Sequence, residues 1–360
     1  MNAPDFFAPN YGVARSKFLA AATAAGAVQQ HFFNDRATGP NGEPLYTDVA
    51  RLGPAAPRRL LLLNSATHGV EGYCGSACQI AVLATGLAQN LPDDCALVLS
   101  HALNPYGFAN DRRVTEDNVD LNRNFVDHDQ PPPDPADYTL LHPALLPDEW
   151  EGADKARSDA LVARYQAERG MAAFQHHVMA GQYSYADGLF FGGRKPSWSN
   201  QVWRRIVRDH CADARQIAFI DFHTGLGPSG VGEAIFLGSD EAMLKRAVDW
   251  YGEVTSTARG TSSSAQVRGD LACAFDQFRE QAEITPIALE FGTVSLIDMI
   301  EAVRADNWLH IRGDPLGAHA ATIKRQIRAA FYEETETWQE AVVTRALAVV
   351  AAALKGLAND

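Results

Sequence analysis

Four short apolar runs in this sequence, each of strand length, are followed at once by polar residues that can do chemistry. A strand covered on both faces is continuously apolar, so these runs indicate the interior of a sheet between layers of helices. The runs cover residues 59–64, 95–100, 216–222 and 284–291, and a further strand pattern covers residues 45–52. Helical patterns occur at residues 14–33, 75–87, 148–180, 240–258 and 316–357. We expect an α/β fold in a single domain over residues 1–360, with a mixed, twisted sheet flanked by helices.

Charge and composition argue against several partners and locations. The chain has 31 basic and 44 acidic residues and a formal net charge of −13, which repels nucleic acid and anionic lipid. No apolar run approaches the roughly 20 residues that span a bilayer, the longest being residues 60–63 and 346–354. Residues 18–27 could form the apolar part of a signal peptide, but Asp5 and the late Arg15 favour an opening helix instead. Five cysteines without C-x-x-C spacing argue against a disulfide framework. We predict a cytoplasmic protein without nucleic-acid or membrane partners.

The first apolar run leads into Thr67-His68-Gly-Val-Glu71-Gly. In open α/β sheets, ligands collect at the carboxyl ends of strands, so this segment is a candidate site. Residues three apart share one face of a helical turn, so His68 and Glu71 can converge on one metal ion. The alternative is an ordinary helix start with Glu71 in its first turn.

Two later strands end in residues that fit the same site. His223 closes the run at residues 216–222, and a catalytic zinc commonly takes three protein ligands, of which His, Glu and His is a known set. Asp221 could orient one imidazole from behind. Glu290 lies among apolar neighbours in the last run, where an unpaired charge must face a cation or a functional cleft. Glu290 therefore suits the general base that takes a proton from water, with a plain salt bridge as the alternative.

A polar stretch after the second run carries Arg112, Arg113, Asn122 and Arg123. Guanidinium groups bind carboxylates through two parallel hydrogen bonds and stay charged when partly buried. A surface ion pair is the alternative for Arg112 or Arg113 taken singly.

These motifs resemble, in their order, those of the zinc carboxypeptidase superfamily, which includes the succinylglutamate desuccinylases and aspartoacylases. The resemblance covers roughly residues 55–300, and the chain is most similar to a bacterial-type branch. The matching motifs are His68-Gly-Val-Glu71, Asn104-Pro-Tyr-Gly107, Asp120-Leu-Asn-Arg-Asn-Phe125, Asp221-Phe-His223 and Leu289-Glu290-Phe. The resemblance implies a mixed sheet flanked by helices, one catalytic zinc ion, and hydrolysis of an amide next to a free carboxylate.

The same resemblance assigns roles to individual residues. It implies that His68, Glu71 and His223 bind Zn²⁺ and that Glu290 is the general base. It further implies that Asn122 and Arg123 bind the terminal carboxylate of the substrate. An arginine shortly before them holds the oxyanion, and Arg113 is our choice, with Arg112 close behind and also a candidate substrate contact.

Two segments fall outside that pattern. Residues 126–199 match no standard carboxypeptidase, and the segment Gly188-Leu-Phe-Phe-Gly-Gly-Arg194 within them could line a pocket or form a tight surface loop. The segment Gly225-Leu-Gly-Pro-Ser-Gly230 formally matches a dinucleotide-binding fingerprint, but it leads into a strand pattern where that fingerprint needs a helix. We predict no dinucleotide site.

We expect a zinc metallohydrolase, first of all a metallocarboxypeptidase, with a peptide or an N-acyl amino acid as substrate. The alternatives are an N-acyl amino acid deacylase with the same centre and a non-catalytic zinc- or peptide-binding protein. Side-chain preference and oligomeric state are left open.

Overall fold

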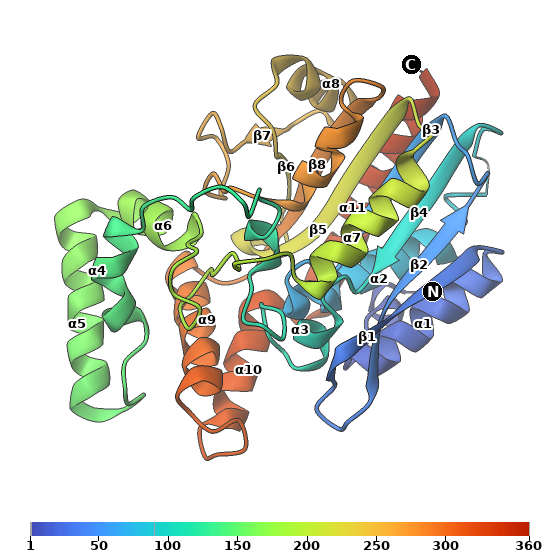
Figure 1. Ribbon diagram of the computed structural model, residues 1–360. Helices are drawn as coiled ribbons and strands as arrows, with labels where there is room; N and C mark the ends of the chain where they lie inside the picture. Colours follow the sequence, from blue (N-terminus) through green and yellow to red (C-terminus); the bar gives the residue numbers. More distant parts are fainter. Residues whose placement is uncertain (1, 90, 360) are drawn as a thin grey trace.

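The computed structural model describes residues 2–89 and 91–359, and it contains a strongly twisted mixed sheet with helices on both faces (Figure 1). In the described part of the chain the strand order across the sheet is β1-β2-β4-β3-β5-β8-β6-β7. The strands are β1 (Val28–Thr38), β2 (Pro44–Leu52), β3 (Arg59–Asn64), β4 (Cys95–His101), β5 (Gln216–Ser229), β6 (Gly232–Phe236), β7 (Thr255–Ser256) and β8 (Glu283–Gly292). The central strands β4, β3, β5 and β8 run parallel, while β1, β2 and β6 introduce antiparallel pairs. The carboxyl ends of the central strands therefore meet at one edge.

Alternate residues of the central strands enter two different hydrophobic cores. Leu61 and Leu63 of β3 pack into one core, and Leu60 and Leu62 pack into the other. This burial on both sides explains why the run is continuously apolar.

The helices are α1 (Tyr11–Ala24), α2 (Gly72–Ala84), α3 (Pro105–Ala109), α4 (Ala136–Leu145), α5 (Gly152–Arg169), α6 (Met171–Met179), α7 (Trp198–Cys211), α8 (Glu241–Tyr251), α9 (Leu296–Ile311), α10 (Ala320–Phe331) and α11 (Glu336–Asn359). The short 3₁₀ helices are η1 (Ala3–Phe6), η2 (Gly69–Glu71), η3 (Leu121–Arg123) and η4 (Leu271–Phe278).

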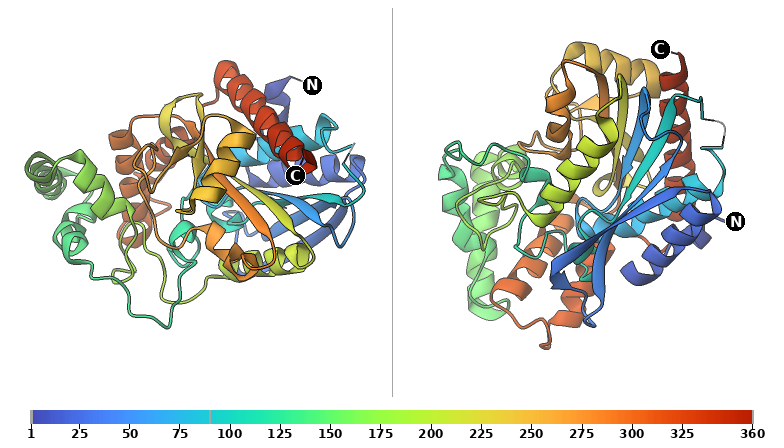
Figure 2. Two further views of the ribbon diagram at one scale, coloured as in Figure 1. Left: turned by 90° about the horizontal axis from the view of Figure 1, so that it is seen from above. Right: turned by 45° about the vertical axis from the view of Figure 1, so that its right-hand side comes forward.

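The two cores lie between the sheet and different helices. Helices α1, α2 and α11 cover one face, and α7 with η4 covers the other (Figure 2). Helices α4, α5 and α6 form a separate group beside the sheet (Figure 1). This group belongs to the segment that matched no carboxypeptidase pattern. The predicted fold class is confirmed.

The helix predicted at residues 240–258 ends at Tyr251 before β7, and those predicted at 148–180 and 316–357 are each two helices. Two further predictions need correction. The helix predicted at residues 14–33 ends at Ala24, and the rest of that range enters β1, because Gly26 has φ +74° and turns the chain. The second concerns α11, which is long and apolar enough to cross a membrane by length and composition, although no apolar run was expected to approach that length. Core helices of soluble proteins pass the same test, and α11 buries Val342, Ala346 and Val350 in the core between itself and the sheet.

Candidate metal centre

The three predicted ligands meet at the carboxyl edge of β3 and β5. His68 and Glu71 lie in and beside η2, directly after β3, and His223 lies in β5. His68 Nδ1 is 2.8 Å from Glu71 Oε1, and His223 Nδ1 is 2.9 Å from Glu71 Oε2. One ligand atom from each of these buried side chains lies within 4.8 Å of the others. Two imidazole nitrogens and a carboxylate, converging in this way, match the donor set that zinc prefers.

The outer nitrogen of each imidazole faces a buried aspartate. His68 Nε2 is 3.3 Å from Asp120 Oδ1 and 2.8 Å from Arg113 Nη2, and His223 Nε2 is 2.7 Å from Asp221 Oδ2. Such carboxylates orient metal-binding imidazoles so that the other nitrogen faces the ion. Asp221 is itself fixed by the Thr67 hydroxyl, which donates to it at 2.8 Å. The contact between Asp221 and His223 matches the orienting role suggested for Asp221 from sequence. From sequence, Asp120 was given no such role.

We expect Asp221→Asn to weaken metal binding about 10- to 100-fold, because the amide orients the His223 ring less firmly. Competition with a chelating dye measures the dissociation constant. Thermal unfolding of the metal-free protein is the control that separates this effect from a general loss of fold. An unchanged dissociation constant would remove Asp221 from the site.

The loop that carries His68 and Glu71 is packed tightly against the arginine-bearing loop. The backbone N–H of Gly69 donates to the Arg113 carbonyl at 3.0 Å, and that of Val70 donates to the Arg112 carbonyl at 2.9 Å. A Cβ at Gly69 would come within 2.0 Å of the Gly107 backbone, so only glycine permits this approach. The backbone at the end of the Asn104-Pro-Tyr-Gly107 motif therefore packs directly against the loop that carries His68 and Glu71.

Glu290 lies on β8 beside His223, its partner in the strand register. Its Oε1 accepts a hydrogen bond from the Leu226 backbone N–H at 3.0 Å. Burial raises the pKa of Glu290 to about 8, and the negative charge of Glu71 adds to this effect. A buried carboxyl with a strongly shifted pKa in a cavity is typical of a functional group.

The glycine-rich segment after His223 forms a bulge of β5. The register between β5 and β8 breaks between Thr224 and Ser229, and the chain continues into β6. Gly225 has φ +127°, which brings the Leu226 N–H to Glu290. The segment opens no helix, as predicted. Its Leu226 N–H instead donates a hydrogen bond to Glu290 of the site.

Arg113 points into the site and Arg112 does not. Arg113 donates to Asp120 Oδ2 at 3.0 Å and to Glu71 Oε1 at 3.2 Å. Arg112 pairs with Asp306 of α9 at 3.0 Å and lies outside the cavity lining among the described residues. Arg112 as a substrate contact thus stays a prediction, and its ion pair with Asp306 is buried, whereas the alternative from sequence was a surface pair.

Arg123 is buried and held mainly by main-chain carbonyls. Its Nε and Nη2 donate to the Met179 carbonyl at 3.0 and 2.5 Å, and its Nη1 donates to the Asn122 carbonyl at 3.0 Å. Burial lowers the pKa of Arg123, and Asp120 opposes this shift. Asn122 faces the same cavity, and its Oδ1 accepts from the Leu271 N–H at 3.0 Å.

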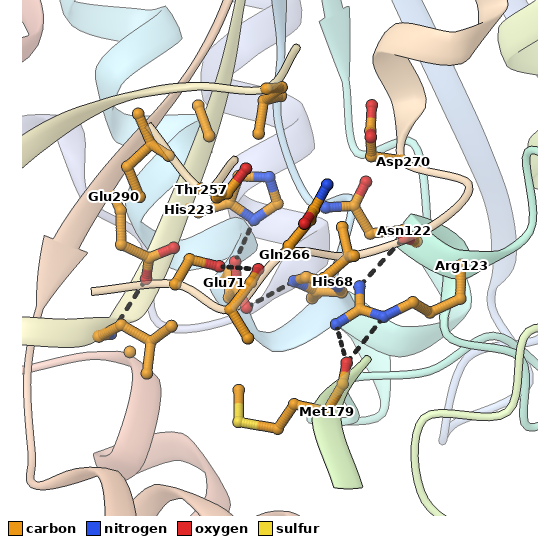
Figure 3. A pocket seen from close by; sticks show the side chains of 18 of the residues that line it. His68, Glu71, Asn122, Arg123, Met179, His223, Thr257, Gln266, Asp270 and Glu290 are labelled. Carbon is orange, nitrogen blue, oxygen red and sulfur yellow. Dashed lines mark hydrogen bonds and ion pairs between the residues drawn. The ribbon is translucent and has the colours of Figure 1, made fainter. Parts of the chain in front are cut away.

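The predicted site residues other than Arg112 line one cavity of about 240 Å³ (Figure 3). Its further lining includes Met179, Gln266 and Asp270, none of which the sequence reasoning singled out. Burial raises the pKa of Asp270 to about 6. The cavity thus combines a metal-type triad, the buried carboxyls of Glu290 and Asp270, and guanidinium groups that include those of Arg113 and Arg123. Such a set is suited to polarising and hydrolysing a carbonyl compound.

Comparison with known proteins places this chain in a family and identifies its fold. The family described as "Protein of unknown function (DUF2817)" matches residues 7–345. Bovine thrombin-activatable fibrinolysis inhibitor, solved with tick carboxypeptidase inhibitor, is similar at 12% identity and a TM-score of 0.51 over 98% of this chain and 97% of that one. A second structure of thrombin-activatable fibrinolysis inhibitor is 12% identical, with a TM-score of 0.53 over 98% and 75% of the two chains.

The succinylglutamate desuccinylase of Chromobacterium violaceum also matches, at 14% identity and a TM-score of 0.39 over 83% and 74% of the two chains. No curated protein matches the sequence significantly. At these identities the likeness to the two structures with TM-scores above 0.5 establishes the zinc carboxypeptidase fold and no shared activity.

Proposed function

The chain belongs to the DUF2817 family of proteins of unknown function, and we propose that it is a zinc-dependent carboxypeptidase. The observation that carries the proposal is the convergence of His68 Nδ1, Glu71 and His223 Nδ1 in one cavity with Glu290. A peptide-binding protein without turnover has no need of a buried carboxyl beside a metal triad.

His68, Glu71 and His223 would hold the ion. When bound, zinc supplies Lewis acidity at a carbonyl oxygen, lowers the pKa of water to about 7 and, as a nearby cation, favours the ionised form of Glu290. Glu290 accepts a proton from the attacking water and passes it to the leaving nitrogen. The Leu226 N–H holds Glu290 Oε1, so its other oxygen is left for this proton.

Arg113 and Arg123 have different tasks in the proposed reaction. Arg113 touches Glu71, so its positive charge lies beside the metal ligands and can stabilise a developing oxyanion. Arg123 uses three N–H groups on the Met179 and Asn122 carbonyls, so two of its five remain, one on each terminal nitrogen. Figure 3 shows the guanidinium of Arg123 facing His68 and Glu71. A substrate carboxylate next to the scissile amide can bind these two donors.

The direct test is an assay of the zinc-loaded protein on a library of peptides with free carboxyl termini and on a set of N-acyl amino acids, followed by mass spectrometry. We expect peptides to lose their terminal residue, a chelator to stop the reaction and added zinc to restore it. Cleavage of N-acyl amino acids alone would make the protein a deacylase with the same centre. Turnover of neither set by the zinc-loaded form would contradict hydrolysis.

We expect Arg123→Ala to lower kcat/KM for substrates with a free carboxylate by about 3 kcal/mol, or roughly 100-fold, because a charged hydrogen-bonded pair is lost. The matched control is the same substrate with its carboxylate esterified, for which wild type and variant should differ little. Equal losses on both substrates would show that Arg123 does not bind the carboxylate.

The predicted cytoplasmic location remains a proposal, supported by cysteines that are all unpaired, four of them buried. Titration of the free thiols of the zinc-loaded protein and localisation of the tagged full chain would test this location independently of activity.

A further inference from the structure

Phe190 lies against two arginines of the cavity, Arg113 and Arg123. The Arg113 Cζ is 5.2 Å from the centre of the Phe190 ring, and the Arg123 Cζ is 5.8 Å from it. The ring is 2% exposed. Phe190 comes from the Gly188–Arg194 segment of the region that matched no carboxypeptidase pattern, so neither the fold nor the metal triad explains its presence there.

The backbone of Phe190 is held in a conformation that bulky residues avoid. Its φ is +52°, in the left-handed region, where an aromatic side chain is an outlier. Such strain persists only where the surroundings hold it, and it clusters at functional sites. Here the Gln182 N–H donates to the Phe190 carbonyl at 3.1 Å, and the Asp120 N–H donates to the Phe191 carbonyl at 2.8 Å. Asp120 is the aspartate behind His68, so the strained segment is tied directly to the site.

The two guanidinium groups share Asp120, Arg113 also contacts Glu71, and the charge of Asp270 acts on Arg123. Arg113 Nε is 3.0 Å from Asp120 Oδ2, and Arg123 Nη1 is 3.8 Å from Asp120 Oδ1. Two buried positive charges side by side repel each other, so each further attractive contact helps to hold them in place. The negative face of an aromatic ring attracts a cation without accepting its N–H groups. Phe190 therefore stabilises both arginines and leaves their remaining donors free for a ligand, whereas a further carboxylate would accept those donors.

We propose that Phe190 is a positioning residue that holds Arg113 and Arg123 in place for anionic groups of the ligand, through the π face of its ring. The proposal rests on the proposed function in one respect, since it takes the two arginines as the groups that contact substrate. The proposal gives residues 126–199 a part in the site. Within them, the Met179 carbonyl holds Arg123 from one direction, and Phe190 holds both arginines from another.

The test replaces Phe190 by phenylalanines of increasing fluorine content, which weakens the negative face of the ring while nearly preserving its size. The same series at Phe191 is the matched control, because Phe191 is 5% exposed and no described cation lies over its ring. The full, zinc-loaded chain is titrated with succinate by calorimetry, and kcat/KM is measured on the free-carboxylate substrate from the library assay.

We expect both the succinate affinity and kcat/KM to fall stepwise along the Phe190 series, reaching about 3- to 30-fold at 3,4,5-trifluorophenylalanine. The Phe191 series should leave both unchanged. Phe190→Leu should lower them at least as far, whereas Phe191→Leu should change only the unfolding temperature. A flat response at Phe190, with wild type binding succinate, would overturn the positioning role and leave the proposed function standing. If wild type bound no succinate and cleaved no substrate, the arginine site and the proposed function would both be refuted.

Discussion

Glu290→Gln should keep its metal and lose most of its turnover. The amide has nearly the shape of the carboxyl and can still accept the Leu226 N–H through its oxygen, so the cavity should be preserved. It cannot take a proton from water, and a positioned general base contributes about 10²- to 10⁴-fold to a reaction of this kind. We therefore expect kcat to fall by about that factor at one bound zinc per chain, measured by elemental analysis and by the rate on the same substrate.

The matched control for this change lies on the same strand. Glu283 is the first residue of β8, at its amino end, and it is exposed. Glu283→Gln removes the same charge and should leave both kcat and the metal content unchanged. Near-normal turnover of Glu290→Gln with zinc bound would show that another group takes the proton.

His68→Ala and His223→Ala should each lower the bound metal well below one ion per chain and abolish turnover. Each change removes one of two imidazole donors and leaves a carboxylate with a single nitrogen, which is too few protein ligands for a stable zinc site. Elemental analysis after dialysis against a weak chelator measures the loss, and a strong chelator should produce the same inactive state reversibly in the wild type.

His176→Ala supplies the control for the histidine changes. His176 is exposed on α6, and its removal should alter neither metal content nor rate. If His68→Ala and His223→Ala both kept a full complement of tightly bound metal, the converging triad would not be the metal site. The pattern of results separates the two roles: the histidine variants lose metal and activity together, whereas Glu290→Gln loses activity alone.

The fold was predictable where burial alone determines residue type. The continuous apolar run of β3 indicated a strand covered on both faces, and its residues do alternate between two cores. Residues 28–33 of the edge strand β1 were misread as helix, because an edge strand has few buried positions and its residues carry no continuous apolar signal. The turn at Gly26 depends on backbone conformation, which a run of small residues does not reveal.

The candidate site was predictable to the extent that its groups are side chains at strand ends. His68, Glu71, His223 and Glu290 follow or end buried strands, so their convergence follows from the parallel arrangement. The contact from Met179 is made by a carbonyl oxygen, which every residue carries, so no residue type could reveal it.

Arg112 and Arg113 show a second limit of the sequence. They are neighbours of the same type, and only the path of the loop turns one toward Asp306 and the other toward Glu71. Asp111, just before them, has φ +47°, a conformation that the sequence pattern did not indicate.

The last turn of α11 lies at the far edge of the sheet from the cavity, because Arg59 at the start of β3 donates to the Leu357 carbonyl at 2.9 Å. Lys355 in that turn is exposed. A molecule tethered to a solid support through a cysteine introduced by Lys355→Cys would present its cavity toward the solution. Immobilised in this orientation, the protein could be washed and exposed to new solutions repeatedly while its cavity stays open to added ligands.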